Sequence, residues 1–245
     1  MSPQDPPAPA TRTNSGWLSA AEQRALDWLA PRVPRWFTPD GLTAVGLAAA
    51  IVAMAGYALA PRYPLALWFV NVALVVNWFG DSLDGKVARL RGIERPRYGF
   101  FLDQSIDILS QLLFAVGLAA SGYIRPEIVM LGLATYLMMT AQSLLRVQAT
   151  GVFHLATGGM GLTEVRCLFL VGNALFYFVP PWPFTIGTTT LAYPDIFGVA
   201  WIATNLGLYV STMIAELRRL AREEQPSPRA SRPTEASPRS DRSRR

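Results

Sequence analysis

Six apolar stretches make up most of this chain, and each is long enough to span or nearly span a lipid bilayer. A transmembrane helix needs about 20 predominantly apolar residues. Apolar residues account for 51% of the 245 residues, which also indicates a membrane protein. The sequence therefore predicts an all-α integral membrane protein with six transmembrane helices. We expect these helices at about residues 42–60, 63–80, 99–122, 127–147, 167–186 and 194–216.

The basic residues are distributed unevenly around these stretches. Of the 22 lysines and arginines, all but Arg62 and Arg125 fall before the first stretch, after the last, or at the second-to-third and fourth-to-fifth connections. Because cytoplasmic loops carry an excess of Lys and Arg, we expect both termini to lie in the cytoplasm. The net charge of +5 requires no nucleic-acid partner, since these residues flank the spans and can meet anionic lipid headgroups.

Residues 17–37, before the first stretch, are predicted to form an interfacial amphipathic helix. Apolar side chains recur at helical spacing, with Gln23 and Asp27 on the opposite face, and Pro31 and Pro34 end the pattern. A short helix packed on the bundle is the alternative. The apolar face consists of Leu18, Ala21, Ala25, Trp28 and Leu29.

The two ends of the chain differ in composition from the rest. Residues 1–16 are polar and Pro-rich, and residues 218–245 are basic and rich in Ser, Pro and Arg. Segments that cannot bury enough apolar surface stay disordered. We therefore expect one six-helix domain at residues 38–217 between two disordered ends. The single cysteine, Cys167, rules out an internal disulfide, and no zinc pattern is present.

Four aspartates lie where the second stretch ends and the third begins. They occur as Asp81-x-x-Asp84 and Asp103-x-x-x-Asp107. These spacings place the members of each pair on one face of a helix. Carboxylates are costly in or next to a bilayer, and four in one space repel one another unless a cation lies between them. The pattern predicts a site for Mg²⁺ or Mn²⁺, which prefer oxygen ligands. A structural ion-pair network with nearby arginines is the alternative.

The aspartates belong to a longer pattern that resembles the motif of the CDP-alcohol phosphotransferases, integral membrane enzymes of phospholipid synthesis. An upstream element is similar to the Pro-(Asp/Asn)-x-x-Thr element of several prokaryotic members. The gap between the two halves of the main motif is at or slightly beyond the usual length, which a loop tolerates. The main motif reads Asp81-x-x-Asp84-Gly85-x-x-Ala88-Arg89, then Gly99-x-x-x-Asp103-x-x-x-Asp107, and the upstream element reads Pro39-Asp40-Gly41-Leu42-Thr43.

The resemblance implies an enzyme of a bacterial or archaeal cytoplasmic membrane with its active site on the cytoplasmic side. Such an enzyme transfers a substituted phosphate group from a CDP-linked donor to an alcohol and releases CMP. The expected donor is CDP-diacylglycerol, because its acyl chains can stay in the bilayer, and the expected acceptor is a small polar alcohol. The resemblance also implies a homodimer.

It further implies roles for the matching residues. Asp81, Asp84 and Asp103 would hold two Mg²⁺ or Mn²⁺ ions. Asp107 would be a further ligand and the general base that takes the proton of the attacking alcohol. Arg89 would meet phosphate oxygens with its planar fork. The other nucleotide-binding positions, including small residues that let the nucleotide approach the backbone, would be Pro39, Asp40, Thr43, Asp81, Gly85, Ala88 and Gly99.

Several of these positions have a structural alternative. Arg89 could reach from a helix end to the membrane surface. The small residues could serve only to pack helices, and Gly99 is also expected to allow close packing where the second and third helices meet. Asp40 or Thr43 could instead cap a helix, because Asp and Thr favour helix starts.

Two arginines near the later stretches are candidates for binding the acceptor. Arg146 and Arg166 resemble regions where family members that use inositol phosphate carry basic residues for the acceptor's phosphate. Gln148 stands where a second arginine is expected there, and Arg166 could instead pair with Glu164. Choline, ethanolamine, serine, inositol and inositol phosphate therefore all remain open as acceptors.

Two other functions compete with this interpretation. One is an enzyme that uses CDP-choline or CDP-ethanolamine with diacylglycerol as the acceptor. The other is an ion-coupled transporter, because carboxylates within spans also serve as ion and proton relays. The aspartates lie near helix ends, and no carboxylate lies inside the last three stretches, so we favour the enzyme.

Overall fold

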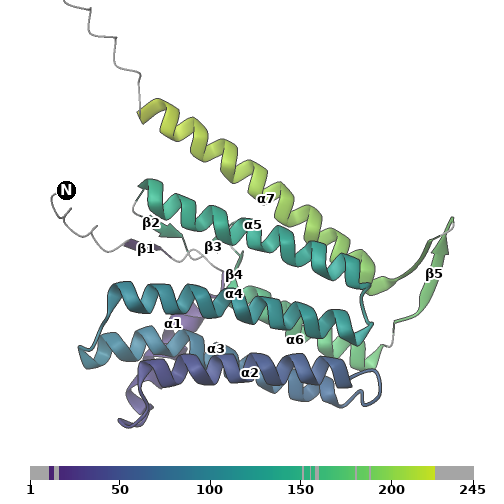
Figure 1. Cartoon of the computed structure of the whole chain (residues 1–245), viewed down its shortest axis with the longest axis horizontal. Coiled ribbons are helices and arrows are strands. Elements are labelled where there is room, and N and C mark those ends of the chain that lie inside the picture. Colours follow the sequence, from purple (N-terminus) through teal and green to yellow (C-terminus); the bar gives the residue numbers. More distant parts are fainter. Residues whose placement is uncertain are drawn as a thin grey trace, which may run out of the picture.

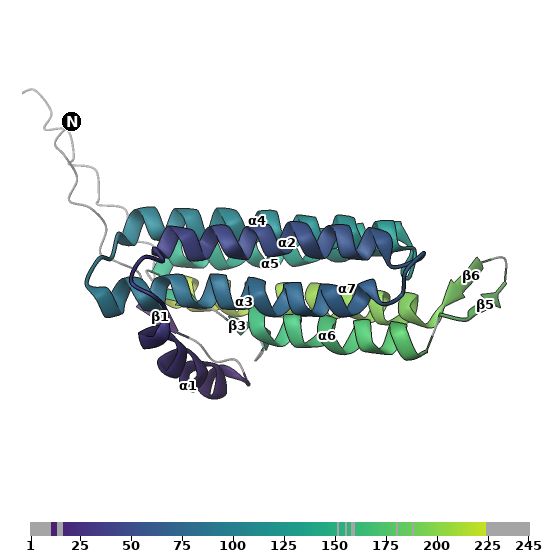
Figure 2. The ribbon, with the colours of Figure 1, turned by 90° about the horizontal axis from the view of Figure 1, so that it is seen from below.

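The computed structural model describes residues 11–13, 17–150, 152–154, 156–157, 160–179, 181–187 and 189–223. In this part of the chain six long helices run alongside one another as an elongated bundle (Figures 1 and 2). Five of them are long and apolar enough to cross a membrane. These five are α2 (Pro39–Leu59), α3 (Ala66–Arg91), α4 (Pro96–Ser121), α5 (Pro126–Thr150) and α7 (Tyr193–Glu223). The predominantly helical structure agrees with the predicted class.

Proline and glycine set the ends of several helices. Pro39, Pro96 and Pro126 begin α2, α4 and α5, where a missing N–H and a fixed φ do no harm. Gly92 and Gly122 follow α3 and α4 with φ of 65° and 67°, a conformation that glycine adopts without steric cost. The helices therefore begin and end where the local sequence allows.

The sixth helix, α6 (Leu162–Phe178), differs from the predicted fifth span at residues 167–186. It begins earlier than predicted and has 17 residues, or roughly 26 Å at 1.5 Å per residue. The sequence after it carries three prolines within four positions, 180–183, which cannot continue a helix. Instead β5 (Pro183–Ile186) pairs antiparallel with β6 (Thr189–Ala192) in a hairpin. The predicted boundary was wrong, and a membrane crossing by α6 stays a prediction.

Helices α2 and α3 approach each other backbone to backbone. A Cβ atom placed on Gly80 of α3 would lie 2.5 Å from the carbonyl oxygen of Leu42 and 2.7 Å from the amide nitrogen of Gly46. On the other side, a Cβ on Gly117 of α4 would lie 2.7 Å from Cα of Met54. Small residues allow such close contacts between membrane helices. Helix α2 is thus held between α3 and α4, and Asp81 directly follows the tightest contact.

Polar side chains link helices inside the bundle. The Tyr57 hydroxyl on α2 donates to Asn173 Oδ1 on α6 at 2.9 Å, and Asn173 Nδ2 donates to Asn71 Oδ1 on α3 at 2.8 Å. Tyr57 and Asn173 are fully buried. Hydrogen bonds of this kind hold transmembrane helices in register.

The segment before α2 contains α1 (Ser19–Leu29) and a short 3-10 turn, η1 (Ala30–Arg32). Figure 2 shows α1 lying obliquely outside the bundle, beside α3. Its buried residue is Leu26, whereas Trp28 from the predicted apolar face is 59% exposed. Arg91 of α3 holds the following loop by donating to the carbonyl oxygens of Phe37 and Val33 at 2.6 and 3.0 Å. A helix therefore lies within the predicted range, whereas its amphipathic, interfacial character stays a prediction.

Three short strands lie between α5 and α6, and a fourth from the start of the chain pairs with one of them. Strand β1 (Thr11–Thr13) pairs in parallel with β2 (Val152–His154), and β3 (Ala156–Thr157) pairs antiparallel with β4 (Met160–Gly161). The rest of the predicted disordered N-terminus lies outside the described residues, as do residues 224–245 of the predicted tail. Helix α7 continues to Glu223, beyond the predicted start of the tail at residue 218.

Candidate functional site

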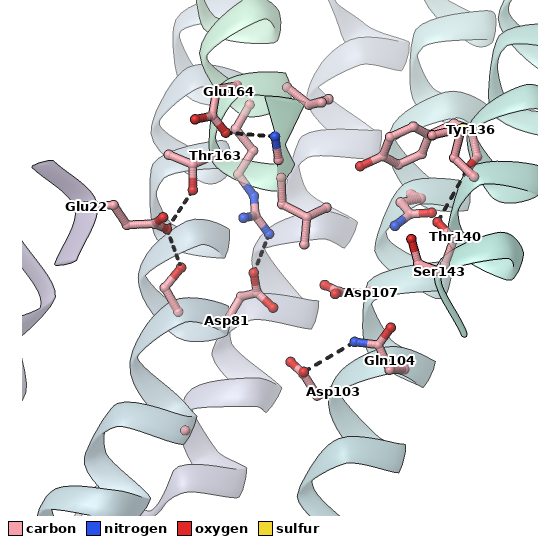
Figure 3. A pocket seen from close by; sticks show the side chains of 18 of the residues that line it. Glu22, Asp81, Asp103, Gln104, Asp107, Tyr136, Thr140, Ser143, Thr163 and Glu164 are labelled. Atoms are coloured by element: carbon pink, nitrogen blue, oxygen red, sulfur yellow. Dashed lines mark hydrogen bonds and ion pairs between the residues drawn. The ribbon is translucent and has the colours of Figure 1, made fainter. Parts of the chain in front are cut away.

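A cavity of about 240 Å³ lies at the end of the bundle near α1 and receives side chains from α1, α3, α4, α5, α6 and α7. Figure 3 shows its interior, with Asp81, Asp103 and Asp107 at the centre and Tyr136, Thr140 and Ser143 on one side. The wall combines acidic, basic and uncharged polar groups from helices that are far apart in sequence. Such convergence of polar groups in a concave site is typical of ligand-binding sites.

Three of the four predicted aspartates form a compact group. Asp81, Asp103 and Asp107 each offer a carboxylate oxygen, and these oxygens lie within 4.8 Å of one another. Hard divalent cations bind oxygens at about 2.0–2.6 Å, so ligand oxygens around one ion are roughly 3–5 Å apart. The spacing and the all-oxygen donor set therefore fit one such cation. The spacings along α3 and α4 correctly predicted that these three side chains meet.

Asp84 is oriented differently from the other three. It lines the same cavity, but its Oδ2 accepts a 2.6 Å hydrogen bond from the Thr43 hydroxyl on α2. It therefore does not belong to the group of three described above. All four aspartates line one cavity, as predicted, but the carboxylate of Asp84 is bonded to Thr43 and lies outside the group of three.

Arg166 lies against the aspartates and is 8% exposed. Its Nη2 donates to Asp81 Oδ2 at 2.6 Å, and its Nε donates to Asn77 Oδ1 at 3.0 Å. Asn77 is itself held by donating from Nδ2 to the Gly46 carbonyl oxygen at 3.0 Å. The alternative pairing with Glu164 was wrong. One guanidinium offsets only one of three negative charges, so the group still favours a divalent cation.

Arg146, the second candidate for the acceptor, lies elsewhere. Its Nε is 3.6 Å from Glu216 Oε1 on α7, and it is not among the described residues that line the cavity. The structure thus brings Arg166 to the aspartates and leaves Arg146 in a pair between α5 and α7.

The upstream Pro39–Thr43 element lies beside the aspartates. Thr38, not Asp40 or Thr43, caps α2, because its hydroxyl accepts from the Gly41 amide at 3.0 Å. The helix-cap alternative for these two residues was therefore wrong. Asp40 instead forms an ion pair with Arg95 in the connection between α3 and α4, and this contact raises the pKa of Arg95.

Of the remaining motif residues, two line the cavity and two are not among its described lining residues. Gly85 and Arg89 line the cavity, and a Cβ on Gly85 would meet Arg89 Nη1 at 3.6 Å, an ordinary contact. Gly99 is exposed, and a Cβ there would meet nothing within 4 Å, so its predicted packing role was wrong. The close helix contacts are made against α2 by Gly80 and Gly117 instead. Ala88 is half-buried on α3.

Glu22 is a residue of the cavity wall that sequence reasoning missed. Its Oε1 accepts hydrogen bonds from Trp78 Nε1 at 3.1 Å, Ser82 Oγ at 3.4 Å and Thr163 Oγ1 at 2.6 Å, which tie α1 to α3 and α6. Figure 3 shows the contact between Glu22 and Thr163. The available signal was its position between Leu18 and Leu26, which places a carboxylate on an apolar helix face.

A second glutamate fixes the start of α6. Glu164 accepts from the amides of Leu18 and Gly161 at 2.7 and 2.9 Å. Helix α1 is therefore part of the cavity wall and is bonded to two other helices.

Comparison with known proteins gives a consistent result. The family model "CDP-alcohol phosphatidyltransferase" matches residues 36–213. The archaetidylinositol phosphate synthase of Methanothermobacter thermautotrophicus is 30% identical over 160 residues, covering 65% of this chain and 77% of that protein. The phosphatidylinositol phosphate synthase of Mycobacteroides abscessus is 29% identical over 170 residues, covering 67% and 74%.

A solved structure shares the fold. It is the phosphatidylinositol phosphate synthase of Mycobacterium tuberculosis with CDP-DAG bound. The TM-score is 0.50 at 21% sequence identity, covering 80% of this chain and 90% of that one.

Proposed function

Because the chain belongs to the CDP-alcohol phosphatidyltransferase family, we propose that it transfers the phosphatidyl group of CDP-diacylglycerol to a small polar alcohol and releases CMP. The family makes the chain a transferase of substituted phosphate groups in phospholipid synthesis, as predicted. The observation that carries the proposal is the group of Asp81, Asp103 and Asp107, which lies within the matched segment and at one end of a bundle of apolar helices.

The donor side of the proposal rests on the motif around α2 and α3. Arg89 lines the cavity and is proposed to bind the diphosphate, with Gly85 leaving room beside it. Pro39, Asp40, Thr43, Ala88 and Gly99 are the further proposed nucleotide contacts. A solved relative of the same fold has CDP-DAG bound, which supports this donor.

The carboxylates are proposed to hold the cations that the family uses. A bound Mg²⁺ or Mn²⁺ ion would supply positive charge to the diphosphate as negative charge develops on the leaving CMP. Asp81, Asp103 and Asp107 are the ligands that the geometry favours, and Asp84 beside them is the proposed ligand of a second ion.

Asp107 is proposed to act as the general base. The acceptor oxygen forms a bond to the phosphorus nearer the lipid, the bond between that phosphorus and the bridging oxygen breaks, and CMP leaves with the electron pair. The proton of the attacking hydroxyl passes to Asp107. Asp107 lies deep in the cavity and is 9% exposed.

The names of the relatives point to one acceptor above the others. Both related proteins are named as inositol phosphate lipid synthases, so inositol phosphate is the first acceptor to test. Arg166, at the edge of the aspartate group, is the cation that would meet the acceptor's phosphate.

Purified protein incubated with Mg²⁺, labelled CDP-diacylglycerol and single alcohols tests this proposal. We expect CMP and a labelled phospholipid with inositol phosphate, and no product from CDP-choline or CDP-ethanolamine with diacylglycerol. If no alcohol releases CMP from CDP-diacylglycerol, the proposed function is wrong. Product from CDP-choline instead would favour the rival donor.

We also propose that the active site and both termini face the cytoplasm, from the distribution of basic residues. This orientation requires that α6 crosses the membrane together with the five longer helices. Reporter fusions after Arg245 and in the loop at Arg62 should report opposite sides of the membrane. The same side for both would contradict the six-helix topology.

The homodimer implied by the family resemblance stays a prediction. Chemical cross-linking of the protein in native membranes should give a species of twice the monomer mass. Only monomer under conditions that cross-link a known dimer would contradict it.

A further inference from the structure

Gln111 lines the cavity one helical turn beyond Asp107 and is not part of the family motif. Asp103, Asp107 and Gln111 follow one another at intervals of four along α4 and therefore share a face of the helix. The Gln111 Oε1 atom is buried and has no hydrogen-bond partner among the described residues. Buried polar atoms are normally paired, so this oxygen is available to a donor that enters the cavity.

The surroundings of Gln111 indicate what kind of donor that is. The side chains that α5 and α7 contribute to the cavity are all uncharged, and most of them carry a hydroxyl or amide group. Figure 3 shows Tyr136, Thr140 and Ser143 on the far side of Asp107 from Asp81. Tyr136 packs against Trp201 of α7, with ring centroids 5.7 Å apart. The members of this uncharged wall are Gln111, Tyr136, Thr140, Ser143, Thr204 and Asn205.

Charge does not separate the candidate acceptors here. Arg166 is buried and paired with Asp81, so a carboxylate already offsets its guanidinium. The uncharged wall distinguishes one acceptor from another through hydrogen bonds to its hydroxyls.

The spacing suits an acceptor with two hydroxyls. Side chains four residues apart on a helix have Cβ atoms about 5–6 Å apart. One polyol can therefore place a reacting hydroxyl at Asp107 and a second, non-reacting hydroxyl at Gln111. The amide oxygen of Gln111 can accept a hydrogen bond from this second hydroxyl, and both groups are uncharged.

We propose that Gln111 determines acceptor specificity by accepting, at Oε1, a hydrogen bond from a non-reacting hydroxyl of a polyol. The neighbouring hydroxyl of that polyol gives its proton to Asp107 and attacks the phosphorus of the donor. This inference rests on the proposed function and defines the class of acceptor for the same site. It assigns to Gln111 a positioning role in acceptor binding and none in donor binding.

The test compares Gln111→Leu and Gln111→Glu with wild type, using inositol phosphate and glycerol phosphate as acceptors. Leu keeps the approximate shape but cannot accept a hydrogen bond, whereas Glu keeps an accepting oxygen. We expect Gln111→Leu to raise the KM for the polyol about tenfold, the effect typical of one lost hydrogen bond, with the KM for CDP-diacylglycerol unchanged. Gln111→Glu should retain most of the affinity for an unphosphorylated polyol such as inositol.

Gln142→Leu is the matched control. Gln142 lies on α5, is not among the described residues that line the cavity, and bonds to the Tyr209 carbonyl oxygen and the Thr212 hydroxyl. The same change there should leave both KM values as in wild type. Size-exclusion profiles of all variants report whether the helices remain assembled.

A deoxygenated acceptor completes a double-mutant cycle. Removing the hydroxyl next to the reacting one should weaken the acceptor for wild type and should weaken it little further for Gln111→Leu. Additive losses, an equal loss of donor binding, or ethanolamine or serine as the preferred acceptor would each overturn the inference. If Gln111→Leu does not fold, the deoxygenated acceptor with wild type and Gln111→Glu decides. Failure of the proposed function can be told apart from failure of this inference, because wild type would then release no CMP with any alcohol.

Discussion

Replacing Asp107 by asparagine is expected to lower turnover by about 10²–10⁴-fold, the usual contribution of general base catalysis. Asparagine keeps the size of the side chain, and its carbonyl oxygen can still ligate a cation, but it cannot take up the proton of the alcohol. Binding of CDP-diacylglycerol and of the cation should therefore stay close to that of wild type. Single-turnover CMP formation, together with donor binding by the same preparation, measures the two effects separately.

Two further variants serve as a control and a comparison for Asp107→Asn. Glu127→Gln makes the same acid-to-amide change at an exposed position in the first turn of α5, outside the cavity wall, and should behave as wild type. Asp84→Ala should mainly weaken donor and cation binding. Near-normal turnover of Asp107→Asn would exclude it as the base. Loss of donor binding as complete as in Asp84→Ala would make it chiefly a ligand.

Chelation of divalent cations is expected to abolish CMP formation, and Mg²⁺ or Mn²⁺ should restore it. Without a cation, the carboxyl groups of Asp81, Asp103 and Asp107 lie against one guanidinium at the point where a diphosphate must bind. Like charges would then oppose donor binding, and no strong positive charge would meet the leaving group. Titration of EDTA-treated protein with each metal, followed by CMP release, gives the activity and the preferred ion.

Asp81→Ala extends this prediction to a single ligand. It removes one oxygen from the group and also leaves the buried Arg166 without its carboxylate partner. Breaking a buried ion pair in this way typically costs about 3–5 kcal/mol, so we expect lower thermal stability as well as weaker metal binding. Full activity of wild type in metal-free buffer would contradict the metal-dependent mechanism outright.

The central site could be predicted from the sequence because its information is local. A spacing of four residues places Asp103 and Asp107 on one face of α4, and the motif that they share with Asp81 predicted that the three lie together. The orientation of Asp84 could not be predicted in this way, since it depends on the Thr43 hydroxyl of another helix. Hydropathy likewise located most of the helices. It extended the fifth span across the prolines at 180–183, although proline ends a helix even where the surrounding sequence is apolar.

The residues that sequence reasoning missed act over long separations. Glu22 bonds to Thr163, which lies 141 positions away, and no periodic pattern reports such a contact. Gln111 continues the spacing of Asp103 and Asp107, but a glutamine on an apolar helix is an ordinary polar residue until the cavity around it is known. For Arg146 the sequence suggested a site residue that the structure places elsewhere. Its partner Glu216 lies on α7, and the residues next to Arg146 in the sequence do not reveal that contact.

The contact of Gly46 with Gly80 has a consequence for how this chain can diverge. Main-chain atoms set the position of Asp81 there, so the lipid-facing side chains of α2 and α3 contribute little to it. Those outward positions are free to exchange one apolar residue for another as the host membrane varies in thickness or fluidity. The freedom ends at Gly80, since any larger residue there would force the helices apart and displace the carboxylate. The catalytic geometry is thereby insulated from sequence drift over most of the surface that surrounds it.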